Sequence, residues 1–292
     1  MSNRSGQGTL LQAKNAIITG ASRGFGRAIA ARLWQEGASL LLVSRSLEAL
    51  RDAQKDIGGT EAAGVHIYAA DLSHESTPDR IIEVAKALWP KLDILVNNAA
   101  ILGPIGRFED NDWREWRNTI ETNLLAPVAL TQLALKWMRS GEDGTVINIS
   151  GGGAAGPRPG FSAYACSKTA LVRFTETIAG EVADRGIRVN CIAPGVMNTE
   201  MVKQVLVAGR RVSGEREYDC ALAAASHAEA IDRAVDLVLF LASPESRGIT
   251  GRLISAVWDP WRGLGSRARE LHDSDIYTLR RIIPSDRGKA WQ

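Results

Sequence analysis

Cysteine is scarce in this chain of 292 residues. Its three cysteines, Cys166, Cys191 and Cys220, form no CxxC pair and have no histidine ligand pattern nearby. A disulfide framework and a structural zinc site are therefore not expected, and we predict no metal site. Unpaired thiols fit a reducing compartment, which for this chain predicts a cytoplasmic location.

Long apolar runs and charge excess are missing too. No stretch approaches eighteen apolar residues, and the first twelve residues lack the apolar core of a signal peptide, so neither a membrane span nor a signal peptide is expected. The 35 basic and 33 acidic residues leave a net charge of +2 without long runs of either sign. This balance predicts a small-molecule substrate, with no nucleic acid and no membrane as partner.

Short apolar runs alternate with helical patterns along most of the chain. The first run, at 15–19, ends at Gly20, and the helical pattern at 25–36 ends at Gly37. Further strands are expected at 40–44, 65–70, 94–97, 145–150, 188–193 and 253–257, and helices at 47–57, 77–88, 113–138, 162–183 and 228–242. This order predicts an α/β fold of the Rossmann type, a doubly wound seven-stranded parallel sheet with helices on both faces, in a single domain.

Two segments fall outside this alternation. Residues 199–227 are weakly periodic and charged around 210–219, and loops of this length are often functional lids, the alternative being a surface insertion. The tail at 261–292 is rich in arginine and aromatic residues. We expect it to pack on the body or on a neighbouring subunit, because disordered tails carry few aromatics.

Three glycines stand at the junction of the first strand and the first helix. In this position Gly20 makes the tight turn, Gly24 lets the backbone approach a pyrophosphate, and Gly26 permits close packing of the helix. The helix N-terminus also offers unpaired N–H groups to an anion. The turn therefore predicts a dinucleotide site, the alternative being a tight turn without a ligand.

The end of the second strand indicates which dinucleotide is bound. NAD-binding folds usually have an acidic side chain there, whereas this chain has Ser44 and Arg45. No carboxylate repels a 2′-phosphate, and Arg45 with Arg23 supplies two guanidinium groups to hold it, although each arginine alone would suit a solvated surface. NADP is therefore expected as the cofactor. Asp71, after the third strand, is placed either to contact the adenine or to cap a helix.

Tyr164 and Lys168 are the candidate reacting pair. They are four residues apart at the start of an expected helix and so share one face, although the same spacing is common on surface helices. A nearby ammonium and the positive nicotinamide would lower the pKa of the phenol. Tyr164 would then exchange a proton with an alcohol or a carbonyl oxygen while hydride moves to or from nicotinamide.

Taken together, these motifs resemble those of the short-chain dehydrogenase/reductase family. The matching segments are 19–26, 71–72, 97–100, 123, 164–168 and 194–199. The cofactor contacts that the resemblance implies, besides those named above, are made by Ser22, Phe25, Leu72, Asn98, Ala99, Ala100, Tyr164, Lys168, Pro194, Gly195, Val196 and Thr199.

The resemblance also implies roles and an assembly. Asn123 would support a proton relay near Lys168, and a homotetramer or homodimer would form through the helices at 113–138 and 162–183. The resulting division of the chain is a flexible lead-in at 1–12, a dinucleotide-binding oxidoreductase domain at 13–260 and a C-terminal extension at 261–292.

One residue departs from the family pattern. Thirteen residues before the tyrosine, where the family usually has a serine that donates to the substrate oxygen, this chain has Gly151. Loss of one such donor costs on the order of 10² to 10³ in rate. Three substitutes remain open: Ser150, if the glycines rotate the backbone; Ser162, which could instead be a helix N-cap; and the backbone N–H groups of 151–153.

The end of the last strand departs as well, since Val257-Trp-Asp-Pro-Trp261 replaces the family's glycine pair. Trp258 and Trp261 are candidate walls for a ring-shaped substrate, with core filling as the alternative. The leading hypothesis is an NADP-dependent oxidoreductase that interconverts a secondary alcohol and a ketone, with a sugar-like or polyol substrate as a guess. The alternative is a non-catalytic NADP-binding sensor or scaffold, which the glycine at position 151 favours.

Overall fold

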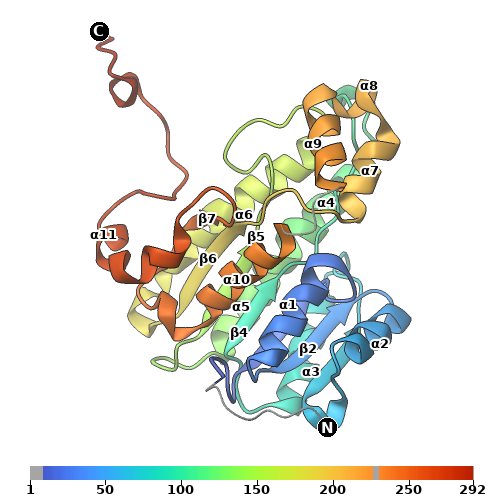
Figure 1. Ribbon diagram of the computed structural model, residues 1–292, viewed down its shortest axis with the longest axis vertical. Helices are drawn as coiled ribbons and strands as arrows, with labels where there is room; N and C mark the ends of the chain where they lie inside the picture. The colour runs from blue at the N-terminus through green and yellow to red at the C-terminus, as the bar shows by residue number, and fades with distance from the viewer. Residues whose placement is uncertain (1–8, 226–229, 292) are drawn as a thin grey trace.

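The computed structural model describes residues 9–225 and 230–291, and within them seven parallel strands form one sheet in the order β3-β2-β1-β4-β5-β6-β7 (Figure 1). The strands are β1 (Asn15–Thr19), β2 (Ser39–Ser44), β3 (Val65–Ala69), β4 (Ile94–Asn97), β5 (Thr145–Ile149), β6 (Arg188–Ala193) and β7 (Leu253–Ser255). The predicted doubly wound parallel sheet is confirmed. Its strand order reverses between β1 and β4, which is where folds of this class bind their ligands.

Helices cover both faces of the sheet, so the strands are buried on each side and read as continuous apolar runs. One face packs against α1 (Gly24–Gln35), α2 (Leu47–Asp56) and α10 (Ala230–Ala242), and the other against α3 (Thr77–Leu88), α5 (Ala126–Trp137) and α6 (Ser162–Glu181). Each face has its own cluster of buried side chains. None of the helices in the described part of the chain is long and apolar enough to cross a membrane.

The helix expected at 113–138 is divided in the structure. α4 (Trp113–Ile120) passes into one wider π-helical turn at Glu121–Leu125, and α5 follows. Pro127, in the first turn of α5, has no N–H to donate to the carbonyl of Asn123 four residues earlier, which explains why α-helical geometry is interrupted here. Such π-helical turns occur often at functional sites, and this one contains the predicted site residue Asn123.

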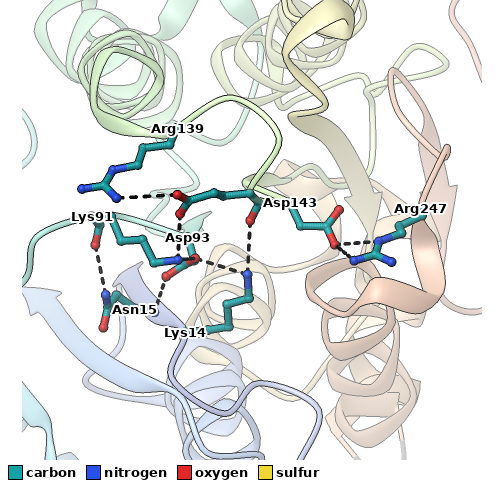
Figure 2. Close-up of polar contacts among 8 residues, drawn as sticks. Lys14, Asn15, Lys91, Asp93, Arg139, Asp143 and Arg247 are labelled. Atoms are coloured by element: carbon teal, nitrogen blue, oxygen red, sulfur yellow. Dashed lines mark hydrogen bonds and ion pairs between the residues drawn. The ribbon is translucent and has the colours of Figure 1, made fainter.

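A charged cluster fixes the amino-terminal ends of the strands (Figure 2). The buried carboxylate of Asp93, just before β4, pairs with Lys14 at 3.2 Å and Lys91 at 3.1 Å and accepts from the backbone N–H of Asn15 at 3.0 Å. Lys91 also pairs with Glu142, in the loop before β5, at 2.9 Å. These contacts join the starts of β1, β4 and β5 at the end of the sheet opposite to the glycine turn.

The segment expected as a loop or lid is helical. It contains α7 (Glu200–Ala208), α8 (Arg210–Ser213) and α9 (Glu215–Ala225), while residues 226–229, including the expected start of the last helix, lie outside the described part. Gly209 and Gly214, at φ +75° and +86°, separate the three helices. Figure 1 shows them gathered near α4, beyond one end of the sheet. Residues 199–225 are called the lid below.

The C-terminal extension lies along α10 and the outer edge of β7 and begins with a 3-10 turn at Trp261–Arg267, followed by α11 (Ala268–His272). Trp261 is only 4% exposed and its ring packs 5.8 Å from that of Phe240. The backbone N–H of Leu253 in β7 donates to the carbonyl of Tyr277 at 2.8 Å. The last residues leave the body as an extended arm (Figure 1). At the other end, residues 1–8 of the predicted lead-in lie outside the described part, and Leu11 is fully buried.

Trp261 packs the extension against α10, so its removal should lower the stability of the fold. Trp261→Ala is expected to lower the free energy of unfolding by roughly 3–5 kcal/mol, because a buried aromatic side chain leaves a cavity. Trp258→Ala is the matched control, since Trp258 is 85% exposed, and its effect should stay within about 0.5 kcal/mol. Urea unfolding of both variants measures the difference, and equal effects would show that the extension adds no stability through Trp261.

Candidate active site

The glycine turn between β1 and α1 has no room for a side chain at Gly20 or Gly26. Gly20 and Gly24 have φ values of +67° and +53°, which favour glycine. A Cβ on Gly20 would lie 2.8 Å from the Cα of Ala99, and one on Gly26 would overlap the carbonyl oxygen of Gly20. The turn is therefore pressed against the end of β4, and the N-terminus of α1 opens beside it.

Thr19 and Asn98 hold this turn in place. The Thr19 hydroxyl oxygen accepts from the backbone N–H groups of Asn98 and Ala99, both at 3.0 Å, and the Asn98 amide donates to the carbonyls of Thr19 at 2.9 Å and Gly20 at 3.2 Å. Asn98 is predicted as a cofactor contact, but in this structure its side-chain amide donates hydrogen bonds to the turn itself. Phe25, also predicted, lies in the core at 5% exposure, which leaves only its backbone for a ligand.

Two arginine side chains without carboxylate partners in the described part of the chain lie at the far end of the turn. The hydroxyl oxygens of Ser22 and Ser44 lie 2.8 Å apart and join the turn to the end of β2. Arg23 and Arg45 beside them are exposed, and neither pairs within 4.0 Å with a carboxylate among the described residues. Backbone N–H groups, a helix N-terminus and two guanidinium groups form a donor set that suits a phosphate-bearing dinucleotide.

Asp71 and Leu72 follow β3 on the same edge. Burial raises the pKa of the Asp71 carboxyl, but the hydrogen bond from the N–H of Ser73, at 2.9 Å, and the charge of Arg45 outweigh it, so that the pKa lies below its usual value. Asp71 thus closes a turn of its own loop rather than capping α3, which begins at Thr77, and Leu72 is 8% exposed.

The segment after β6 leads from the turn to the lid. Gly195 has φ +89°, and a Cβ there would lie 2.6 Å from Val257, which explains the glycine after Pro194. Val196 is 53% exposed. A Cβ on Gly24 would meet the methyl group of Thr199 at 3.7 Å, so the first residue of the lid lies next to the glycine turn.

Tyr164 and Lys168, both on α6, lie in the interior at 7% and 1% exposure. The Lys168 ammonium donates to the carbonyl of Ile149 at 2.8 Å and lies 5.7 Å from the centre of the Tyr164 ring. Burial lowers the pKa of Lys168 to about 8. Burial raises the pKa of Tyr164, and the charge that opposes this rise belongs to Arg158. In this structure the Lys168 ammonium donates to Ile149, and its expected effect on the pKa of the phenol stays a prediction.

Asn123 connects two parts of the site. Its side-chain oxygen accepts from the backbone N–H of Ile101 at 2.8 Å, and its amide donates to the carbonyl of Ile101 at 2.8 Å and to the hydroxyl of Ser167 at 3.2 Å. The side chain therefore ties the loop after β4 to α6. Its part in a proton relay stays a prediction.

Gly151 and Tyr164 are in contact. A Cβ placed on Gly151 would overlap the Tyr164 hydroxyl, with two further ring carbons at 3.1 Å. The phenol therefore occupies the space in which the side chain of a residue at this position would begin. A serine fits at position 151 only if the tyrosine moves.

Of the three predicted substitutes for the missing serine, Ser162 is bound elsewhere, whereas the buried hydroxyl of Ser150 has no hydrogen-bond partner among the described residues. The Ser162 hydroxyl accepts from the ring N–H of Trp116 at 3.1 Å and from the Asn111 amide at 3.4 Å, so it binds α4 and its preceding loop. Ser150 is buried beside the thiol of Cys191, whose pKa burial raises to about 12. The backbone N–H groups of 151–153 remain available as candidates.

The predicted wall residues Trp258 and Trp261 do not belong to the apolar cluster around Tyr164. Trp258 is 85% exposed, and Trp261 fills the core against α10. The wall that Tyr164 does have comes instead from the lid. The apolar cluster around the phenol contains Leu102, Phe161, Val202, Val205, Ala221 and Ala224.

Arg158 is a residue that the sequence analysis missed. Its guanidinium carbon lies 4.1 Å from the centre of the Phe161 ring and 5.4 Å from that of Tyr164, and the side chain pairs with Glu217 of α9 at 2.7 Å. No motif marks an arginine in a glycine-rich loop. Only the helical spacing of Val202 and Val205 hinted that the lid has an apolar face.

Comparisons with known proteins agree with this geometry. The family model described as "short chain dehydrogenase" matches residues 14–208. The chain belongs to the short chain dehydrogenase family. Human "Dehydrogenase/reductase SDR family member 4" is 33% identical over 241 residues, covering 82% of this chain and 85% of that protein. The 3-oxoacyl-[acyl-carrier-protein] reductase of Escherichia coli (strain K12) is 32% identical over 245 residues, covering 83% and 95%.

Solved structures of the family are similar as well. A short chain dehydrogenase from Shigella flexneri 2a str. 301, complexed with NADP, superposes with a TM-score of 0.74 at 26% identity and covers 86% of this chain and 99% of its own. The family assignment predicted from the motifs is therefore confirmed.

The contact between Gly151 and Tyr164 yields a prediction. Gly151→Ala should lower kcat/KM roughly 10²-fold, because the new methyl group displaces the phenol and a shift of about 1 Å at a reacting group can cost that much. Gly156→Ala is the control, since nothing lies within 4 Å of a Cβ there, and it should leave kcat/KM unchanged. Steady-state reduction of a panel of ketones measures both, and full activity of Gly151→Ala would contradict the close contact.

Proposed function

We propose that this protein is an NADP-dependent oxidoreductase that interconverts a secondary alcohol and a ketone. The observation that carries the proposal is the phenol of Tyr164, buried under an apolar lid whose first residue adjoins the glycine turn. Family membership and the NADP complex of the Shigella flexneri relative support the choice of reaction and cofactor.

The residues at the glycine turn would hold the dinucleotide. The N-terminus of α1 and the backbone of Gly20 and Gly24 would face the pyrophosphate. Arg23 and Arg45, exposed and without carboxylate partners, would hold the 2′-phosphate near Ser44. Bound NADPH would supply the hydride for reduction of the substrate carbon, and bound NADP⁺ would accept it in the reverse reaction.

Tyr164 would hold the transferred proton on its hydroxyl oxygen. A phenol carries a proton that it can give to a carbonyl oxygen as negative charge develops there, although burial alone raises the pKa of Tyr164 and so opposes this transfer. Lys168 anchors α6 to the end of β5 through Ile149, and Asn123 anchors it to the loop after β4. Both then act as positioning residues, and the lid excludes water from the phenol.

The substrate should have an apolar body next to its carbonyl group. The hydrophobic side chains packed with Tyr164 come from the lid, from the loop after β4 and from the residue before α6, beside the ion pair of Arg158 and Glu217. Such walls favour an apolar ketone over the sugar-like or polyol substrate that the sequence left open.

The predicted homodimer or homotetramer and the cytoplasmic location remain proposals. Trp113 of α4 and Leu125 of the following turn are 62% and 54% exposed, which supports burial of this region in a subunit contact. The three cysteines are free, which supports a reducing compartment.

Tyr164→Phe tests the reaction. Without the hydroxyl, no proton reaches the carbonyl oxygen, and NADPH-dependent reduction of ketones should fall by on the order of 10² to 10⁴. NADPH binding, measured by fluorescence titration, should stay the same. Equal turnover before and after the change would refute the enzyme hypothesis and leave a nucleotide-binding sensor or scaffold.

Arg45→Ala tests the cofactor. The loss of one charge-assisted contact should raise the Kd of NADPH roughly 10- to 100-fold and leave that of NADH unchanged. Arg287→Ala, in the distant C-terminal arm, is the control. Tighter binding of NADH than of NADPH by the wild-type protein would contradict the assignment of the 2′-phosphate site.

A further inference from the structure

We propose that Arg158 replaces the missing serine hydroxyl: its guanidinium donates a hydrogen bond to the carbonyl oxygen of the substrate, beside the Tyr164 hydroxyl. The inference rests on the proposed function, because it assigns a further catalytic residue to the same site. Two observations support it: Arg158 lies over the loop at 151–153, and its guanidinium has N–H groups without hydrogen-bond partners among the described residues.

The positions of Tyr164 and Arg158 relative to this turn are complementary. The Tyr164 hydroxyl occupies the space next to the Cα of Gly151, and the guanidinium occupies the space next to Gly152, where a Cβ would lie 3.7 Å from its carbon, Nε and Nη1 atoms. The two groups therefore flank adjacent residues of one turn.

Arg158 keeps donors for such an oxygen. A guanidinium has five N–H groups, and Nε and Nη2 both donate to a single oxygen of Glu217, at 3.0 and 2.7 Å. The flat face of the guanidinium covers Gly152, and Nη1 makes no hydrogen bond among those described. The ion pair with α9 thus orients the guanidinium and leaves Nη1 as an unpaired donor beside the turn.

Burial makes this charge effective. The Arg158 side chain is only 16% exposed and lies against the ring of Phe161 at 4.1 Å, under the apolar face of the lid. Electrostatic contacts are stronger in such surroundings than in water. A donor held there stabilises negative charge as it develops on a carbonyl oxygen.

The other charged groups around Tyr164 do not supply this charge. The Lys168 ammonium is directed to Ile149, and the Cys191 thiol beside it stays protonated because burial raises its pKa. On α7, Glu200 and Lys203 pair with each other at 3.5 Å and are exposed. Glu217 of α9 is bound to Arg158 itself.

The step balances without a further reactant. In reduction, hydride from the nicotinamide forms the new C–H bond and the carbonyl π electrons move to oxygen. Tyr164 gives its proton to that oxygen. Arg158 donates only a hydrogen bond and keeps its protons, so it needs no change of charge during turnover.

Arg158→Met and Arg158→Lys test the proposal. Arg158→Met should lower kcat/KM for ketone reduction roughly 10²-fold, mainly through kcat, as for the loss of one oxyanion donor. It should also move the titration of Tyr164 to higher pH, because the opposing positive charge is gone. Arg158→Lys should restore the titration and part of the rate.

The titration is measured without cofactor or substrate. Tyrosinate absorbance is followed against pH, and the same curve for Tyr164→Phe is subtracted to isolate Tyr164. Arg210→Met is the matched control, because Arg210 also forms a 2.7 Å ion pair within the lid, with Asp219. It should change neither the rate nor the titration of Tyr164, which is isolated by subtracting the curve of the Arg210→Met and Tyr164→Phe double variant, because Arg210 also lies 4.6 Å from the centre of the Tyr218 ring.

Glu217→Gln distinguishes a catalytic role of Arg158 from a purely structural role of its ion pair with α9. It breaks the same ion pair but keeps the guanidinium, so the Tyr164 titration should not rise and kcat/KM should stay at least tenfold above that of Arg158→Met. Equal effects of Glu217→Gln and Arg158→Met, or an unmoved rate or titration in Arg158→Met, would overturn the role of Arg158. If Tyr164→Phe is inactive in that case, only this inference fails and the proposed function stands.

Discussion

The structure of the site depends on the contact between a phenol and a residue without a side chain. Tyr164 lies against Gly151, and a Cβ there would overlap its hydroxyl. The glycine that removes the family's usual donor therefore also makes the space that the tyrosine occupies. In this position the phenol is buried, its pKa rises, and the neighbouring charge that opposes the rise is that of Arg158.

The rest of the fold supports this contact from three directions. Lys168 bonds the carbonyl at the end of β5, and Asn123, in its π-helical turn, ties α6 to the loop after β4. The lid adds an apolar cover and one ion pair, from Glu217 to Arg158. At the opposite end of the sheet, the Asp93 cluster fixes the starts of β1, β4 and β5 (Figure 2). The reacting groups are thus held by elements that are themselves rigid.

Patterns local in the sequence predicted the fold and the framework of the site. Apolar runs that end at glycine predicted the parallel sheet, and the turn at 20–26 is shaped as its glycines require. Pro127 is a local sign of the break in the helix at 121–125. The partners of the site side chains depend on tertiary packing, because Trp116 binds Ser162 from another helix and the Lys168 ammonium donates to the carbonyl of Ile149. Arg158 belongs to the same class, since only its packing reveals its role.

The substrate oxygen is expected to bind between Tyr164 and Arg158, beside the turn that contains Gly151. A crystal structure of the protein with NADP and an unreactive analogue of an apolar ketone tests this placement. The analogue's oxygen should lie within hydrogen-bond distance of both the Tyr164 hydroxyl and Nη1 of Arg158. An oxygen bound instead by the backbone N–H groups of 151–153, with Arg158 directed only at Glu217, would contradict it.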